Sequence, residues 1–334
     1  MSRKWKNYTS LRHIDGFRMR EAAGGIMVNY RNTLIAAFVG LVGWLGMAPA
    51  SMAEPTFVGP EKCQECHKEE HKVWEGTKHF ESFREVHRAK GAREIAEATG
   101  ERNMRRSDVC TICHYTVIDD RAEAGPSCES CHGPASEWIE IHNDYGGKEV
   151  KREQETPEHK AERMAKAAAA GMIWPTEKFD VAMNCNGCHG LANPKLSGEN
   201  VALMLDNDHP IKPDWNLVAY SQGSVRHRFY PPDVNTNQKM SEPELARLFV
   251  TGKIAKLLSA TQAMGKTDHA KYVEAQQARI ADAKSGLAPV SVPEVQAFVG
   301  DPTEDNARNA IAAIEDKDLT GEVGGMLPPE SAYK

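Results

Sequence analysis

The sequence predicts a mainly α-helical protein, in which short helices and loops are organised around one repeated motif. Two observations favour this fold class. Aromatic residues make up only 7% of the 334 residues, so a bound group would have to supply much of the apolar core. Helix-start signals, namely capping boxes and proline at a first helical position, recur along the chain. Extensive regular sheet is therefore not expected.

The repeated motif is Cys-x-x-Cys-His, and its four copies use all 8 cysteines of the chain. This is the pattern of covalent c-type haem attachment. Two thiols three residues apart reach the two vinyl groups of one porphyrin, and the adjacent histidine falls under the iron as a ligand. The cysteines are Cys63, Cys66, Cys110, Cys113, Cys128, Cys131, Cys185 and Cys188, and the histidines are His67, His114, His132 and His189. The motifs predict four covalently bound c-type haems with short helices and loops wrapped around them.

Two other readings of the cysteines remain open at this point. Zinc sites use paired Cys-x-x-Cys units, but they do not require a histidine directly after each pair. A Cys-x-x-Cys disulfide suits a redox enzyme, but such enzymes place it in a β-α-β context that this chain does not show.

The first 53 residues read as a secretory signal peptide. An apolar run from Leu34 to Met47 follows Arg31, and Ser51-Met-Ala53 then offers the small residues that a signal peptidase reads. The alternative, a single membrane anchor, is disfavoured because the run is short. We expect cleavage after Ala53 and a periplasmic or extracellular protein.

The mature chain is acidic. Seven of the 41 Lys and Arg residues and two of the 47 Asp and Glu residues lie in the leader, which leaves 34 basic and 45 acidic residues and a net charge of −11. This charge argues against nucleic acid as a partner and allows docking to a basic redox protein. We expect contact with a membrane only through such a partner.

The chain after the leader divides into two parts. Residues 54–235 contain the four motifs and form the predicted tetrahaem domain. Residues 236–334 contain no cysteine and read as a helical C-terminal extension. Capping boxes at Ser241-Glu-Pro-Glu244 and Ser291-Val-Pro-Glu294 start two of its helices. The helices that we expect cover 68–74, 77–98, 157–170, about 245 onward, 267–284 and 304–315.

The order and grouping of the motifs resemble those of the tetrahaem cytochrome c-554 family over about residues 57–200. The first site reads Cys63-x-x-Cys66-His67-Lys68, followed by Trp74, Thr77 and His79. The second site is followed closely by the third, Cys128-Glu-Ser-Cys-His-Gly-Pro134. His142 and then Phe179, before the fourth site, also match the family pattern.

The resemblance implies a periplasmic electron carrier whose haems stack in pairs, mostly with two histidines on each iron. It implies one five-coordinate haem, here the haem of Cys110 and Cys113. It also implies that His79 is the distal ligand of the third haem and His142 that of the first. The chain departs from the family in two places: Asp180 stands where the family has a distal histidine, and the family lacks the long tail after residue 200.

The distal ligand lost at Asp180 needs a replacement. Pro210 restricts His209 to an extended backbone, which suits a loop that reaches back to a haem. We therefore expect His209 to be the sixth ligand of the fourth haem, with His227 as the alternative. His87 is a weaker candidate, and His71 is expected at the surface. His159 and His269 lie in polar helices and are expected to be solvated.

Electron transfer between redox partner proteins is the function that these features favour, since irons with two histidines are closed to substrates. One alternative is an enzyme that acts on a small nitrogen or sulfur species, such as nitric oxide or hydroxylamine, at a five-coordinate haem of Cys110 and Cys113. A second alternative is a subunit of a polymeric conductor, in which a neighbouring copy donates a distal histidine. The sequence does not identify the electron donor or acceptor.

Overall fold

The computed structural model describes residues 54–334, so the predicted leader and its cleavage site lie outside the described residues. Glu54–Lys334 form one compact unit. The division that we predict at residue 235 separates the cysteine motifs from the extension in the sequence, and it stays a prediction. Within the described part, no helix is both long and apolar enough to cross a membrane.

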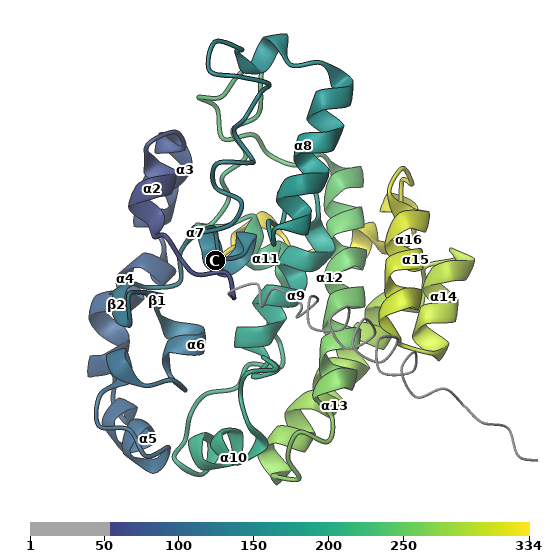
Figure 1. The fold of residues 1–334 in the computed structure, drawn as a ribbon. Coiled ribbons are helices and arrows are strands. Elements are labelled where there is room, and N and C mark those ends of the chain that lie inside the picture. Colours follow the sequence, from purple (N-terminus) through teal and green to yellow (C-terminus); the bar gives the residue numbers. More distant parts are fainter. Residues whose placement is uncertain (1–53) are drawn as a thin grey trace, which may run out of the picture. The chain divides into compact units, whose positions relative to one another are not determined.

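The first half is built from short helices, as predicted (Figure 1). The elements in order are α2 (Pro60–Gln64), α3 (Lys68–Glu75), α4 (Lys78–Glu85), η1 (Val86–Arg88), α5 (Ala92–Ala98), η2 (Met104–Arg106), α6 (Thr111–His114), β1 (Thr116–Ile118), β2 (Arg121–Ala124), α7 (Cys128–His132), η3 (Arg152–Gln154) and α8 (Pro157–Ala169). The strands β1 and β2 form an antiparallel hairpin between the second and third motifs.

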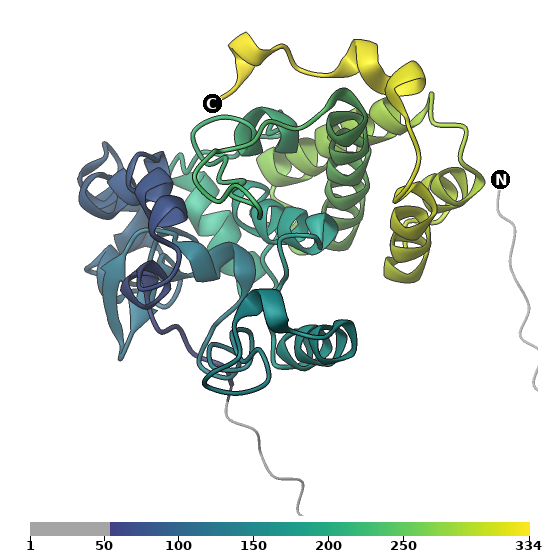
Figure 2. The same ribbon diagram turned by 90° about the horizontal axis from the view of Figure 1, so that it is seen from above.

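The second half contains the longer helices. It comprises α9 (Lys178–His189), α10 (Gly198–Asp206), α11 (Leu217–Ser221), α12 (Glu242–Ala263), α13 (Ala270–Leu287), α14 (Pro293–Gly300), α15 (Glu304–Ile314), α16 (Thr320–Val323), η4 (Gly324–Met326) and η5 (Glu330–Ala332). The last residues return to α11 (Figure 2). There the backbone N–H of Lys334 donates to the Ala219 carbonyl at 3.0 Å.

Three predicted helix boundaries are wrong, each for a local reason. The helix expected at 77–98 is broken into α4, η1 and α5, since Gly91 adopts a left-handed φ of 83°. The helix expected to end at residue 284 continues to Leu287 as α13, and it includes Gly286, whose lack of a side chain leaves room for Lys253. Ser291 does not cap α14, because its hydroxyl donates to Glu322 at 2.6 Å.

Two other helix starts are confirmed. The Thr156 side chain accepts the His159 N–H at the start of α8, with Pro157 at the first helical position. Ser241 and Glu244 form the predicted capping box of α12. The first turn of each helix is thus fixed by residues that can be read from the sequence.

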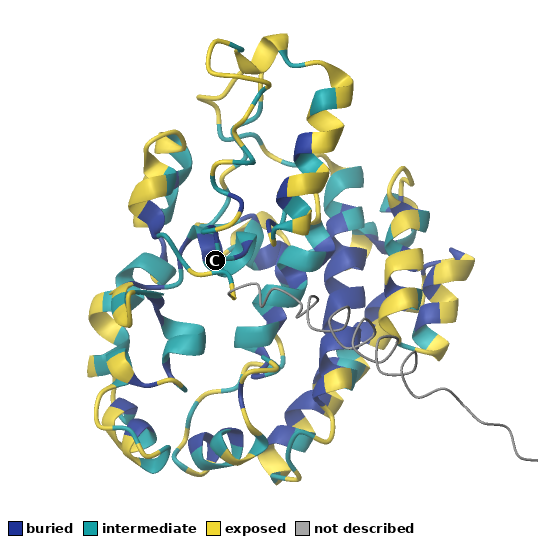
Figure 3. Ribbon diagram, in the orientation of Figure 1, coloured by how far each residue is buried: buried dark blue, intermediate teal, exposed yellow. Residues whose placement is uncertain are grey.

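The main hydrophobic core lies around α12. This helix packs along α9 and α13 and also contacts α11, α15 and α16, and it is buried along most of its length (Figure 3). The core combines Phe179 and Ala182 of α9 with Phe249, Ile254 and Leu257 of α12. The extension therefore packs directly against the helix that ends in the fourth motif.

Candidate haem-binding sites

Each of the four motifs forms a helical turn, and each motif histidine lies at a helix terminus. His114, His132 and His189 are the last residues of α6, α7 and α9, and His67 is the N-cap of α3. A helical turn places residues three and four apart on one face, so the two thiols and the histidine of each motif can meet one group. All eight cysteines are free thiols in this structure.

Every motif histidine faces a second histidine from a distant part of the chain. The ring centres of His67 and His142 are 6.3 Å apart, and those of His189 and His79 are 6.2 Å apart. The corresponding distances are 6.1 Å between His114 and His209, and 6.2 Å between His132 and His227.

This spacing fits an iron between two imidazoles. With metal–nitrogen bonds of about 2.0 Å and each ring centre about 1 Å behind its nitrogen, two axial imidazoles have centres about 6 Å apart. Rings in direct contact would lie closer together. The residues present therefore fit four c-type haems, although the coordination of each iron stays a prediction.

Backbone carbonyls orient several of these rings. Nδ1 of His132 donates to the Ile173 carbonyl at 2.9 Å. In the same way, His142 donates to Ile139 at 2.5 Å and His227 donates to Val225 at 2.6 Å. A proton on Nδ1 leaves the Nε2 lone pair free, and such a hydrogen bond to the second ring nitrogen is typical of metal-binding histidines.

Burial favours the neutral form of five of these rings. It lowers the pKa of His114, His132 and His189 to about 4 in each case. Burial also lowers the pKa of His79 and His209. A neutral imidazole is the form that binds a metal, so these rings need no deprotonation at neutral pH.

The facing pairs differ from three of the expected ligand assignments. His79 faces His189 of the fourth motif, not His132 of the third. His209 faces His114 of the second motif, not His189. A second histidine thus lies opposite His114 of the second motif, the motif whose haem we expect to be five-coordinate. Only His142 faces the partner that the family resemblance implied.

Asp180 has a structural contact of its own, and the histidine opposite His189 comes from α4 rather than from the loop after α9. Asp180 accepts a hydrogen bond from Arg308 of α15 at 3.0 Å, so its carboxylate ties α9 to the extension. His79, carried by α4, takes the place opposite His189. His227 faces His132, a role that we had weighed only as an alternative at the fourth haem.

The remaining histidines lie outside the four pairs, and two of them differ from expectation. His71 is buried, with 6% of its surface exposed, and packs edge-on against Trp74. His269 is not solvated, because its Nε2 lies 3.0 Å from Asp206 and only 16% of its side chain is exposed. His159 contacts Glu155 at 2.8 Å, and His87 lies in η1.

Contacts between cysteines of different motifs indicate how the sites are ordered. The thiols of Cys63 and Cys128 are near enough that each shifts the pKa of the other, and α2 packs against α7, so the first site adjoins the third. Cys131 and Cys185 join the third to the fourth, and Cys188 and Cys113 join the fourth to the second. The order in space is therefore first, third, fourth, second, although the second and third motifs are neighbours in the sequence.

A residue that sequence reasoning missed is Glu129, inside the third motif. Its side chain is 1% exposed and accepts the backbone N–H groups of Val58, Gly59 and Ala135. Burial raises the pKa of Glu129, opposed by these hydrogen bonds. The carboxylate thus ties the lead-in segment before the first motif to the third motif.

The comparisons with known proteins confirm the family resemblance. Residues 62–133 match the family model "Cytochrome c554 and c-prime". The chain is also 26% identical over 149 residues to a protein named Cytochrome c-554 from Nitrosomonas europaea. That match covers 41% of this chain and 59% of the relative. No solved structure matches the chain.

Proposed function

We propose that this chain is a tetrahaem c-type cytochrome that transfers electrons between redox partner proteins through four haems, each with two axial histidines. The observation that carries the proposal is the set of four facing histidine pairs with ring centres 6.1–6.3 Å apart. Similarity to cytochrome c-554 supports an electron-transfer role. A haem bound at each site supplies a one-electron iron couple.

The pairing of His114 with His209 argues against the alternative of a haem enzyme. A small nitrogen or sulfur species needs an open iron, and the second site was the candidate for one. His209 lies opposite His114 with its ring centre 6.1 Å away, which fills the position where such a substrate would bind. A polymeric conductor is likewise disfavoured, since every motif histidine has its facing partner within the same chain.

The order of the sites suggests an electron route from the first haem, through the third and fourth, to the second. The first site is the most open of the four motif positions, since Cys66 is exposed and 53% of the His67 side chain is exposed. We propose that a redox partner docks there. We also propose that the protein is exported, with cleavage near Ala53, because c-type haems are attached outside the bacterial cytoplasm.

Mass spectrometry and electron paramagnetic resonance test this function on the protein purified from its native compartment. The mass should equal that of the 281-residue chain from Glu54 plus four haems. The ferric protein should show only low-spin signals, and the ferrous protein should bind no carbon monoxide. A high-spin signal from intact protein would instead support the enzyme alternative, and fewer than four haems would contradict the proposal.

A further inference from the structure

Arg279 of α13 is a buried cation that has no carboxylate partner within residues 54–334. It is 1% exposed. All of the hydrogen bonds that its guanidinium donates go to uncharged oxygens. These are Oε1 of Gln276 at 2.5 Å, Oδ1 of Asn186 at 2.7 Å and Oγ of Ser259 at 3.2 Å. Burial lowers the pKa of Arg279 to about 10, so the group keeps its positive charge at neutral pH.

The guanidinium lies directly against the fourth motif. Asn186 is the residue after Cys185, and Gly190 follows His189. A side chain at Gly190 would begin 2.4 Å from the Arg279 guanidinium carbon, so only glycine allows this approach. Gln276 also donates to the Gly190 carbonyl at 2.9 Å. The extension therefore holds a positive charge at the carboxyl end of α9, next to the proximal histidine.

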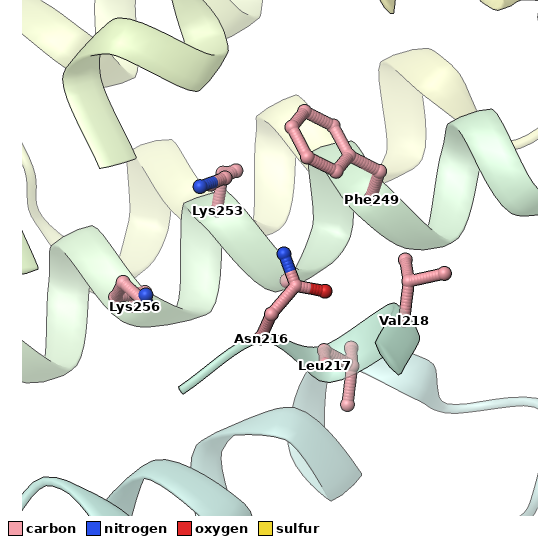
Figure 4. A pocket seen from close by; sticks show the side chains of 7 residues that line it. Asn216, Leu217, Val218, Phe249, Lys253 and Lys256 are labelled. Atoms are coloured by element: carbon pink, nitrogen blue, oxygen red, sulfur yellow. The ribbon is translucent and has the colours of Figure 1, made fainter. Parts of the chain in front are cut away.

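Neighbouring groups do not cancel this charge. Lys253 and Lys256 of α12 are also buried, at 7% and 3% exposure, and they share the single carboxylate of Asp282 at 2.7 Å each. Both lysines line the small pocket beside Asn216, on the side of α12 that faces α11 (Figure 4). The carboxyl end of a helix offsets about half of one positive charge, so a net positive charge remains behind the fourth site.

We propose that Arg279, which the extension contributes, raises the reduction potential of the fourth haem through its positive charge. The fourth haem is the haem of Cys185 and Cys188. The physical cause is simple: a nearby positive charge disfavours the ferric state more than the ferrous state, and burial weakens the screening by water. The inference rests on the proposed function, and it gives the extension a role in electron transfer through the charge that it places behind α9.

Spectroelectrochemical titration of the four-haem protein tests this inference. In Arg279→Gln, one of the four midpoint potentials should fall, so that the oxidised-to-reduced ratio of that haem rises by about tenfold at a fixed applied potential. Arg279→Lys keeps the charge and should restore most of the potential. Mass spectrometry of each variant must first show four haems, because a missing haem would reflect failed maturation rather than a change in potential.

A second variant separates the charge from the packing. Gln276→Glu keeps Arg279 and places a carboxylate in contact with it, so the same midpoint potential should fall. Arg308→Gln is the matched control: Arg308 also links the extension to α9, but it is 52% exposed and already paired with Asp180 and Glu304. It should leave all four potentials unchanged.

Three outcomes would overturn the inference: unchanged potentials in Arg279→Gln, a shift that Gln276→Glu does not reproduce, or an equal shift in Arg308→Gln. Each of these results leaves the proposed function intact. That function fails separately, if the parent protein carries fewer than four haems or an open iron.

Discussion

His142 and His227 show how a single residue becomes a candidate ligand. Each donates its Nδ1–H to a carbonyl two or three residues earlier in the chain, so the local backbone helps to fix the ring and leaves Nε2 free. His209 has no such bond, and its Nδ1 is buried without a partner. The ring of His209 is thus held by packing and by its place after α10, and a bound iron would contribute more to fixing its orientation.

Replacing His209 by alanine should open the second haem. Removal of the ring facing His114 leaves that iron with one histidine, so the ferric variant should gain one high-spin signal and the ferrous variant should bind one carbon monoxide per chain. The covalent haem should remain, because Cys110 and Cys113 are unchanged. His159→Ala is the control, since His159 contacts Glu155 and faces no motif histidine. If His209→Ala stayed fully low-spin, the facing geometry would not represent ligation.

The elements that carry the sites are short, and they depend on buried polar contacts rather than on their own helical stability. A helix of five residues such as α7 is marginal by itself. Glu129 fastens α7 to the lead-in segment through the backbone N–H groups of Val58 and Gly59, and it also accepts the N–H of Ala135. The same principle holds for α8, whose Arg163 donates to the carbonyl of His142 at 2.5 Å and to Glu155 at 2.7 Å.

Glu129→Ala should detach the lead-in segment from the third motif. Three backbone donors would lose their acceptor in a largely buried place, which costs about 3–5 kcal/mol in the free energy of unfolding. Denaturant unfolding of the haem-loaded protein measures this loss, and limited proteolysis should show earlier cleavage near residues 54–59. Glu123→Ala, on exposed strand β2, provides a control of the same chemistry. Equal stability of the two variants would contradict the assigned role of Glu129.

The Glu155–Arg163 contact predicts acid sensitivity of the first site. Hydrogen bonding from Arg163, assisted by His159, lowers the pKa of Glu155 to about 2, against about 4.3 in an unfolded chain. A lowered pKa stabilises the folded state fully above about pH 4.3, and this contribution is lost as the pH falls towards 2. We therefore expect the turn that carries His142 to loosen over this range.

A pH titration of the low-spin signal measures this effect. In the parent protein, one haem should lose its low-spin signal as the pH falls from about 4.3 to 2. Glu155→Gln should weaken the attachment of α8 already at neutral pH and should flatten the acid transition. An identical acid transition in the variant and the parent would assign the transition to another group.

At the scale of the whole molecule, the sequence predicted which motifs form the sites, but it did not predict which histidines face each other or in what order the sites lie in space. The four motifs, the helical class and the helix starts at Thr156 and Ser241 depend on residues close together in the chain, and these could be read directly. The pairing of His209 with His114 brings the loop after α10 next to α6, a long-range contact that no local pattern encodes. The order of the sites was hidden for the same reason, because spacing along the chain does not determine contact in space.

That order gives a prediction about electron flow through the whole protein. In the spatial order first, third, fourth, second, the third site lies between the exposed first site and the other two, and the second site lies at the far end. His227→Met should raise the potential of the third haem, since a methionine ligand favours the ferrous state. An electron that enters at the first haem would then be trapped at the third, and each 1.4 kcal/mol of uphill transfer slows the next step about tenfold.

Pulse radiolysis of the fully oxidised protein can follow this transfer, with the absorbance of each haem as the readout. His227→Met should slow the reduction of the fourth haem strongly. His209→Met is the matched control, because it makes the same change at the end of the chain and should leave transfer from the first haem to the fourth at the parent rate. If both variants slowed this transfer equally, the second haem would lie between the first and the fourth, and the cysteine contacts would not represent the electron route.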